Sequence, residues 1–338
     1  MPRFIRACKR QDVDKTPVWF MRQAGRYLPG YRKLRENYSL FELIRNPRLA
    51  AKVVEEPVHA FGFDAAIIFA DIVLPLTTMG AEVSLKEKVG PVFSKPVRSR
   101  ADVDRLVSGE PSKQLGFVYQ QIGILKQSLP RVPLIGFSGA PFTLAAYLVE
   151  GGYSRNFESA KSFMYGNTEA WRKLMKMLTE SIIDYVRAQV KAGVDAVQLF
   201  DSWVGSLSPA DYSEFVEEYV SQILAEIDGV PRIYFGTCTA GLLDRFSKLE
   251  ADVISVDWRV TISEAWRRLG HDKAIQGNLD PSALLGGKQI SLRRSKEILD
   301  DADGRPGHIF GLGHGVLPET DPAVVGEVVD FVHHYELR

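Results

Sequence analysis

The sequence predicts a single α/β domain, a (β/α)8 TIM barrel with its active site at the C-terminal ends of the strands. Eight short apolar runs, several rich in β-branched residues, alternate with segments of helical periodicity along the 338 residues. Most runs lack the apolar/polar alternation of a half-exposed strand, so we expect parallel strands buried on both faces. The open doubly wound sheet is the alternative, but no G-x-G-x-x-G follows the first run.

The predicted strands and helices alternate along the chain. The strands are residues 18–21, 65–69, 132–137, 196–200, 232–235, 253–256, 273–276 and 308–312. Apolar residues recur every three to four positions from Thr168 to Ala192, which predicts a helix with Gly193 as its C-terminal cap. Another helix is predicted for residues 209–227, with Ser208 as its N-cap.

The connection over residues 71–131 is too long for one crossover helix. Within it, residues 81–93 (AEVSLKEKVGPVF) predict a small hairpin, and residues 112–128 predict a helix. No repeat of fixed period, low-complexity segment or Ser/Gly/Pro-rich linker divides the chain. We therefore expect one domain over residues 1–338.

The overall composition excludes several classes of protein. The 42 basic and 42 acidic residues cancel, which argues against a general nucleic-acid or membrane binder. Cys8 and Cys238 are far apart and form no CxxC or Cys/His cluster, so neither a disulfide framework nor a standard zinc site is indicated. No apolar run reaches transmembrane length and the N-terminus lacks a signal-peptide core, so we expect a cytoplasmic protein.

Residues 17–35, PVWFMRQAGRYLPGYRKLR, carry a local excess of positive charge. The stretch has no Asp or Glu and five basic residues: Arg22, Arg26, Arg32, Lys33 and Arg35. Arg22 directly follows the apolar run, where a desolvated guanidinium is costly unless a carboxylate or phosphate pairs with it. A solvated basic loop is the alternative. We favour anion binding for Arg22 and Arg26, because the planar fork of Arg pairs with carboxylates bidentately.

Other polar residues follow the later strands, at the end of a barrel where active sites are built. Asp71 follows a fully apolar run, although it could also cap a turn or pair with an Arg. Tyr147 could be core, Ser202 an N-cap, and the glycine-rich turn around His314 a phosphate cradle. Further polar or aromatic residues at strand ends are Thr237, Cys238, Asp257, Trp258 and Asn278. A pocket with arginines, an acid, a tyrosine and a histidine suits a carboxylate-bearing substrate that supplies its own electron sink.

Two long stretches resemble the signatures of one enzyme family. PVWFMRQAGRYLP (17–29) and GFSGAPFTLAAYLVEG (136–151) are similar to the uroporphyrinogen decarboxylase family. Further blocks match in the same order: FADI (69–72), LFDSWVGSLSP (199–209), QGNLDP (276–281) and GLGHGVLPETDP (311–322). The chain departs from the family at Gly30, where members often carry an acid, and at Gly311, where Asn is common.

The resemblance implies a (β/α)8 barrel that acts as a homodimer with no metal or organic cofactor. It implies conversion of uroporphyrinogen III to coproporphyrinogen III in haem biosynthesis, by loss of four acetate carboxyls. Arg22 and Arg26 would bind substrate carboxylates, and Asp71 would accept hydrogen bonds from pyrrole N–H groups. The remaining implied substrate contacts are Tyr147, Ser202, His314, Gln23 and Phe200, with Tyr147 also among the catalytic set.

Two other functions stay open. Corrinoid-dependent methyltransferases resemble this family and bind zinc through a His-x-Cys pair and a later Cys. Here Gly236 and Thr237 precede Cys238, and no later Cys exists. A non-catalytic tetrapyrrole carrier would bind substrate and leave its acetates unchanged; the intact set of Arg22, Arg26, Asp71 and Tyr147 argues against it.

Overall fold

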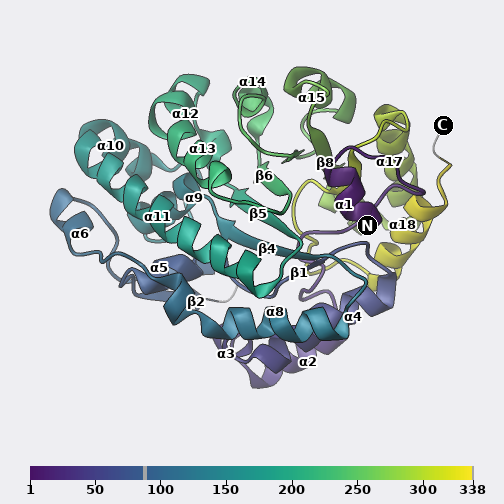
Figure 1. Cartoon of the computed structure of the whole chain (residues 1–338), viewed down its shortest axis with the longest axis horizontal. Helices are drawn as coiled ribbons and strands as arrows, with labels where there is room; N and C mark the ends of the chain where they lie inside the picture. The colour runs from purple at the N-terminus through teal and green to yellow at the C-terminus, as the bar shows by residue number, and fades with distance from the viewer. Residues whose placement is uncertain (87–89, 337–338) are drawn as a thin grey trace.

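A curled parallel sheet of seven strands forms the centre of the computed structural model, which describes residues 1–86 and 90–336. The strand order is β1-β4-β5-β6-β7-β8-β9, so successive strands of the sheet are neighbours in space. Figure 1 shows the helices in an arc around these strands. The seven strands are β1 (Ala66–Ile67), β4 (Leu134–Gly139), β5 (Ala196–Asp201), β6 (Arg232–Gly236), β7 (Val253–Ser255), β8 (Ala274–Leu279) and β9 (His308–Leu312).

Helices occupy most of the connections between the strands. The helices before β4 are α1 (Arg3–Cys8), α2 (Pro29–Asn37), α3 (Leu40–Arg45), α4 (Pro47–Phe61), α5 (Leu74–Thr78), α6 (Arg100–Asp104), α7 (Pro111–Gln114) and α8 (Gly116–Ser128). Those between β4 and β7 are α9 (Pro141–Glu150), α10 (Glu158–Gly166), α11 (Thr168–Ala192), η1 (Val204–Ser206), α12 (Pro209–Phe215), α13 (Glu217–Ala225), η2 (Thr239–Leu242) and α14 (Leu243–Phe246). The last are α15 (Ile262–Leu269), α16 (Pro281–Leu285), α17 (Gly287–Ala302) and α18 (Pro322–His334).

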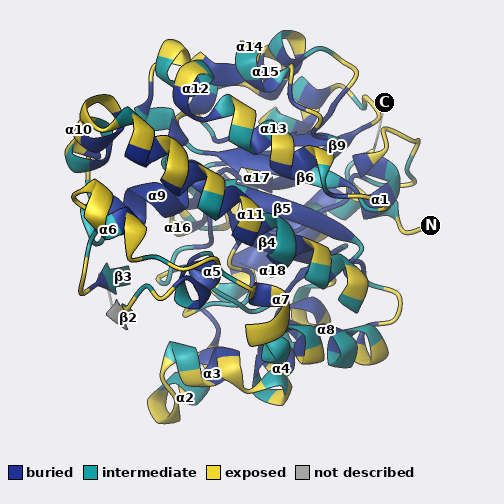
Figure 2. Ribbon diagram, turned by 60° about the vertical axis from the view of Figure 1, so that its left-hand side comes forward, coloured by how far each residue is buried: buried dark blue, intermediate teal, exposed yellow. Residues whose placement is uncertain are grey.

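Helix α11 illustrates how an apolar helix face packs on the sheet. The apolar residues of α11 recur on one face, and Trp171, Leu174 and Leu178 are completely buried where the helix packs on β4 and β5. In Figure 2 the strands of the seven-stranded sheet are mostly dark blue, and much of the outward surface of the helices is yellow. Gly193 ends α11 with φ of 112°, as the sequence predicts, because a left-handed residue closes the last turn at least cost in glycine.

Two other predicted helices are each divided in the structure. Ser208 caps α12 by accepting the Asp211 N–H at 3.1 Å, but Val216, with φ of −134°, separates α12 from α13. Leu115, with φ of −105°, likewise separates α7 from α8. The predicted hairpin is confirmed as β2 (Val83–Lys86) paired antiparallel with β3 (Gly90–Phe93), and its predicted residues 87–89 lie outside the described residues.

The first predicted strand is wrong as a regular strand. Residues 18–21 form one isolated parallel bridge, between Val18 and Phe310 of β9. On its other side, Val18 donates its N–H to the Asp64 carboxylate at 2.8 Å and accepts the Asp64 N–H at 2.9 Å. Because a side chain takes the place of a partner strand and the chain turns at Arg22 (φ 58°), the segment spans the gap between β9 and β1 without extending the ladder.

Asp64 joins three distant parts of the chain beside this segment. Its carboxylate accepts from Arg3 of α1 at 2.8 Å and from the backbone N–H of Val18, and it lies 2.7 Å from Nε2 of His333 in α18. The carboxylate is almost fully buried, with 8% of its side chain exposed. Removing one partner of a buried ion pair destabilises a protein, because the other charge is left buried and unpaired. Asp64 therefore holds segments from both ends of the chain near β1.

A polar cluster crosses the interior of the curled sheet. The Trp19 indole donates to Gln276 of β8 at 2.9 Å, and the Gln276 amide donates to Gln198 of β5 at 3.2 Å and to Ser255 of β7 at 3.0 Å. All four side chains are buried. Because buried polar groups are costly unless hydrogen-bonded, these contacts specify how the segment that carries Trp19 docks against the sheet.

Candidate active site

Four of the residues predicted from the sequence come from four different connections and act on one another electrostatically. Arg22 follows the segment that bridges to β9, Asp71 follows β1, Tyr147 lies on α9 after β4, and His314 follows β9. The charges of Asp71 and Arg22 each affect the other's pKa, and Arg22 also affects the pKa values of Tyr147 and His314. The fold thus brings these four residues to the C-terminal edge of the sheet, where barrel active sites lie.

The Arg22 loop is fixed against the glycine-rich turn after β9. Val316 donates its N–H to the Met21 carbonyl at 2.9 Å, and a Cβ added to Gly315 would collide with Cγ and Cδ of Arg22. Arg22 is exposed to solvent. The surrounding protein atoms lower its pKa, and the charges of Tyr147 and Asp71 act in the opposite direction. Glycine at 315 therefore leaves room for the arginine stem to lie across the turn.

Asp71 is a half-buried carboxylate with one structural contact. Its Oδ1 accepts the Val73 N–H at 3.0 Å, so it does cap a turn, which was the alternative to a functional role. Among the described residues, no Arg or Lys nitrogen pairs with it within 4.0 Å. Burial raises the pKa of Asp71, against the effects of the Val73 N–H and Arg22. The carboxylate thus keeps acceptor capacity for a cationic or N–H-bearing ligand.

Tyr147 is buried on α9 and keeps its proton. Burial, followed by the charge of Asp71, raises the pKa of Tyr147 to about 12, so its hydroxyl remains a hydrogen-bond donor at neutral pH. The ring packs edge-on against Trp203, with 5.9 Å between the ring centroids. A buried donor next to Arg22 is suited to a carboxylate oxygen.

His314 is neutral at physiological pH. Burial, together with smaller effects of the positive charges of Arg22 and Arg259, lowers the pKa of His314 to about 4. Its ring lies 6.2 Å from that of Phe235, which belongs to an aromatic row on successive strands. Phe200 lies between Phe137 and Phe235 in this row, with centroid distances of 5.4 and 5.6 Å.

The other predicted site residues are placed differently. Gln23 is completely buried, and its amide donates to the Ala65 carbonyl at 3.3 Å, so it lies beneath the Arg22 loop. Ser202 is half-buried, and its carbonyl accepts from the Thr237 hydroxyl at 2.5 Å. Arg26 is exposed on the same loop as Arg22, and its positive charge helps to lower the pKa of Arg22.

A buried carboxylate that the sequence does not single out supports the helix of Tyr147. Asp201, the last residue of β5, accepts from the N–H and hydroxyl of Thr143 at 3.2 and 2.7 Å and from the Tyr234 hydroxyl at 2.7 Å. Burial raises the pKa of Asp201 to about 6, although these three donors act to lower it. Thr143 lies one turn before Tyr147 on α9, so Asp201 sets the position of Tyr147 relative to β5. The sequence signal was a carboxylate directly after the predicted strand of residues 196–200.

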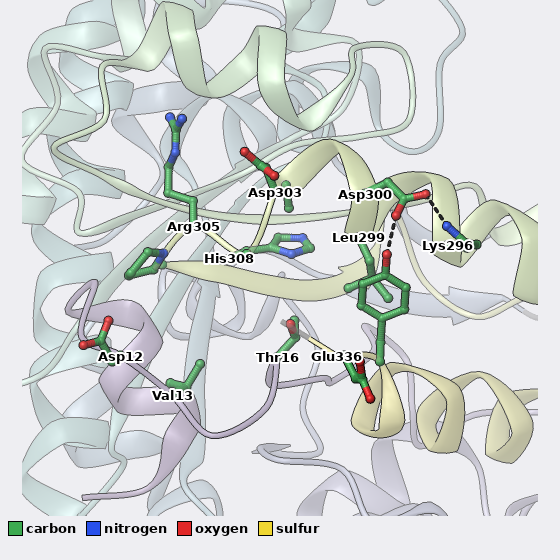
Figure 3. Close-up of a pocket in the computed structure, with 15 residues that line it drawn as sticks. Asp12, Val13, Thr16, Lys296, Leu299, Asp300, Asp303, Arg305, His308 and Glu336 are labelled. Atoms are coloured by element: carbon green, nitrogen blue, oxygen red, sulfur yellow. Dashed lines mark hydrogen bonds and ion pairs between the residues drawn. The ribbon is translucent and has the colours of Figure 1, made fainter. Parts of the chain in front are cut away.

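A cavity of about 470 Å³ lies away from these residues. It opens around His308, the first residue of β9, at the opposite end of the strand from His314. Figure 3 shows Asp303 and Arg305 beside it, with Asp12 and Thr16 on the neighbouring N-terminal segment. No predicted site residue lines this cavity, so we do not assign the chemistry to it.

The described residues contain neither a metal-binding cluster nor a membrane-spanning helix. No group of three or more His, Cys, Asp or Glu side chains in residues 1–86 and 90–336 is arranged to hold a metal ion. In the same part of the chain, no helix combines the length and apolar character needed to cross a membrane.

Solved structures share this fold at low sequence identity. A methyltransferase from Methanosarcina mazei superposes with a TM-score of 0.78 at 21% identity, over 98% of this chain and 97% of that one. A B12-independent methionine synthase from Shewanella sp. W3-18-1 gives a TM-score of 0.56 at 9% identity, over 86% and 89% of the two chains. At these identities the likeness concerns the fold alone.

Sequence comparisons are far more specific. The family described as Uroporphyrinogen decarboxylase (URO-D) matches residues 1–335. Proteins named uroporphyrinogen decarboxylase are 48% identical in Roseiflexus sp. (strain RS-1), over 98% of both chains, and 49% identical in Sorangium cellulosum (strain So ce56), over 98% of this chain and 95% of that protein. Together with the arginine, carboxylate, tyrosine and histidine gathered at one edge of the sheet, these matches establish that the chain belongs to the uroporphyrinogen decarboxylase family.

Proposed function

We propose that this protein decarboxylates the four acetate side chains of uroporphyrinogen III to methyl groups, giving coproporphyrinogen III in tetrapyrrole biosynthesis, with no cofactor. The observation that carries the proposal is the half-buried Asp71 beside Arg22 and Tyr147, in a chain 48% identical to named uroporphyrinogen decarboxylases. An anionic group surrounded by carboxylate-binding groups suits a substrate with N–H donors at its centre and carboxylates around its rim.

The chemistry follows from the need to stabilise the electron pair left when CO2 departs. A proton adds to the pyrrole carbon that bears the acetate arm and makes the ring cationic. The bond to the carboxylate breaks, its electrons enter the ring, and CO2 leaves. The exocyclic methylene then takes up a proton and the ring carbon loses one, which leaves a methyl group. Each acetate thus consumes one proton net and releases one CO2.

Each side chain has a proposed role in this sequence. Asp71 accepts the pyrrole N–H groups and stabilises the cationic ring, an interaction that is stronger away from bulk water. Arg22 and Arg26 orient the substrate carboxylates, because tight ground-state binding of the reacting carboxylate would not speed its loss. Arg22, which interacts electrostatically with Asp71 and Tyr147, is our candidate for the donor of the ring proton.

The remaining residues contact the rim of the substrate. Tyr147 donates to a carboxylate oxygen, neutral His314 offers one donor and one acceptor, and Ser202 offers its hydroxyl. Phe200, in the aromatic row, packs against the macrocycle. For Gln23 the buried position favours support of the Arg22 loop over direct substrate contact.

The test is anaerobic incubation of purified, metal-stripped protein with chemically reduced uroporphyrinogen III. After oxidation, the porphyrins are separated by chromatography according to carboxyl number. We expect the eight-carboxyl substrate to give products with seven, six, five and four carboxyls in succession. Binding with unchanged substrate would support the carrier function instead, and stoichiometric zinc in the protein as purified would favour a methyltransferase.

We also propose that two copies of the chain associate as a homodimer, as the family resemblance implies. We further propose that residues 18–21 take the position of the eighth strand and close the sheet into a barrel. The position of Val18 between Phe310 and Asp64 supports the second proposal. Sedimentation at several protein concentrations tests the dimer. A single species at the monomer mass of 37.8 kDa would rule it out.

A further inference from the structure

A third guanidinium, which the sequence analysis did not identify, lies at the same edge of the sheet. Arg259 follows β7, and its Nη1 donates to Asp257 Oδ2 at 2.6 Å. Asp257 is 1% exposed and also accepts the backbone N–H of Cys238 at 2.6 Å. The guanidinium carbon lies 4.4 Å from the centre of the Trp258 ring. Arg259 is therefore held on two sides, while 45% of its side chain is exposed.

Backbone contacts keep the turn of Arg259 rigid. The Asn278 amide donates to the Asp257 carbonyl at 3.0 Å and to the Val260 carbonyl at 2.6 Å. Arg259 also donates its own N–H to Asp257 Oδ1 at 3.0 Å. An arginine fixed in this way loses little side-chain entropy when it binds an anion.

The glycine-rich turn after β9 places His314 between two cationic side chains. A Cβ on Gly313 would lie 2.7 Å from the Trp258 ring and 2.9 Å from Cα of Asp257, so this side of the turn packs on the Arg259 loop. On the other side, Gly315 packs against the stem of Arg22. The electrostatic effects of both arginines on His314 agree with this order.

We propose that Arg259 is a further carboxylate-binding residue, placed across His314 from Arg22, and that it binds a propionate of the substrate. The inference rests on the proposed function. Arg22 is electrostatically coupled to Asp71 and Tyr147, where the ring becomes cationic, and Arg259 is coupled to His314. A firmly held carboxylate far from the reacting centre improves binding and orientation, whereas holding the reacting acetate firmly would oppose its loss.

The product of the reaction distinguishes the two kinds of carboxylate, because coproporphyrinogen III keeps the propionates and has no acetates. The experiment compares wild-type protein with Arg259→Gln, measuring KM and kcat for uroporphyrinogen III and the inhibition constant of coproporphyrinogen III. We expect both KM and the inhibition constant to rise about tenfold, with kcat changed less than twofold. Arg267→Gln is the matched control, since Arg267 is paired with Glu264 on the surface of α15.

A second variant, Arg259→Lys, separates a binding defect from a folding defect. Its ammonium group retains the positive charge beside buried Asp257 but lacks the planar fork of Arg. This variant should give an intermediate rise in both constants with an unchanged melting temperature. Unchanged KM and inhibition in both variants would overturn the inference, as would a rise in KM alone, which would mean that Arg259 binds an acetate. A fall confined to kcat would also overturn it. Absence of decarboxylation by wild-type protein would instead refute the proposed function.

Discussion

Replacing Asp71 by Asn tests whether its charge stabilises a cationic ring. Asn keeps an acceptor for the Val73 N–H, so the turn after β1 should persist. For a carboxylate about 4 Å from a unit positive charge, at an effective dielectric constant of about 20 for a partly buried site, the interaction is worth about 4 kcal/mol. If this interaction is made mainly in the transition state, its loss should lower kcat about a thousandfold.

The same substitution should leave stability unchanged or raise it. Burial raises the pKa of Asp71, which means that the folded environment disfavours the charged form. This contribution lowers the stability of the wild-type protein as pH rises through the range in which Asp71 ionises, and Asn removes it. A loss of turnover with no loss of stability would therefore separate chemistry from folding.

The assay measures initial formation of the seven-carboxyl product under anaerobic conditions, together with the melting temperature. Asp321→Asn is a matched control, because Asp321 caps α18 with the same contact, from the N–H two residues ahead at 2.9 Å. It should retain wild-type turnover. Wild-type turnover in Asp71→Asn would refute the electrostatic role, and a lowered melting temperature with reduced turnover would make Asp71 a structural residue.

Three further predictions concern the surroundings of Asp71. Gly315→Ala should displace Arg22 and lower kcat/KM at least tenfold. Gly241→Ala is the control and should have no effect, because a Cβ there meets no atom within 4 Å. A kcat/KM of Gly315→Ala equal to that of wild type would show that the stem of Arg22 moves freely. Because the pKa of His314 is about 4, the pH profile of kcat/KM should show no ionisation of this residue near 6.5, so His314→Gln should leave the profile above pH 5 unchanged in shape. Asp201 has a pKa raised from 3.8 to about 6, so its folded form retains the proton and stability falls as pH rises between these values. Urea unfolding should therefore give a free-energy difference between Asp201→Asn and wild type that changes by roughly 2 kcal/mol from pH 4 to pH 7. A difference that stays constant with pH would contradict the shift.

Most of the sheet could be predicted because its strands are buried on both faces, so continuous apolar runs mark them. The run at residues 18–21 has the same character but forms only a bridge at Val18. Its outer hydrogen bonds go to Asp64, and the backbone turns at Arg22 with positive φ. Neither feature changes hydrophobicity, so periodicity alone gives no sign of it.

The candidate site could be proposed from the sequence where a polar residue lies shortly after a predicted strand, as Asp71 and His314 do. Gln23 lies next to Arg22 in the sequence but points into the core, because a sharp turn sends neighbouring side chains in different directions. Arg259 was not identified, since its relevance depends on the packing of Gly313 against Trp258, a contact between distant parts of the chain.

The docking of Arg22 on the turn after β9 has a consequence for synthesis of the protein. Gly315 and Val316, which hold its loop, follow Arg22 far along the sequence and are therefore synthesised long after it. A nascent chain that ends before β9 has neither the bridge to Phe310 nor a surface for the Arg22 stem. The contacts that fix Arg22 therefore form only after β9 and the turn that follows it have been synthesised.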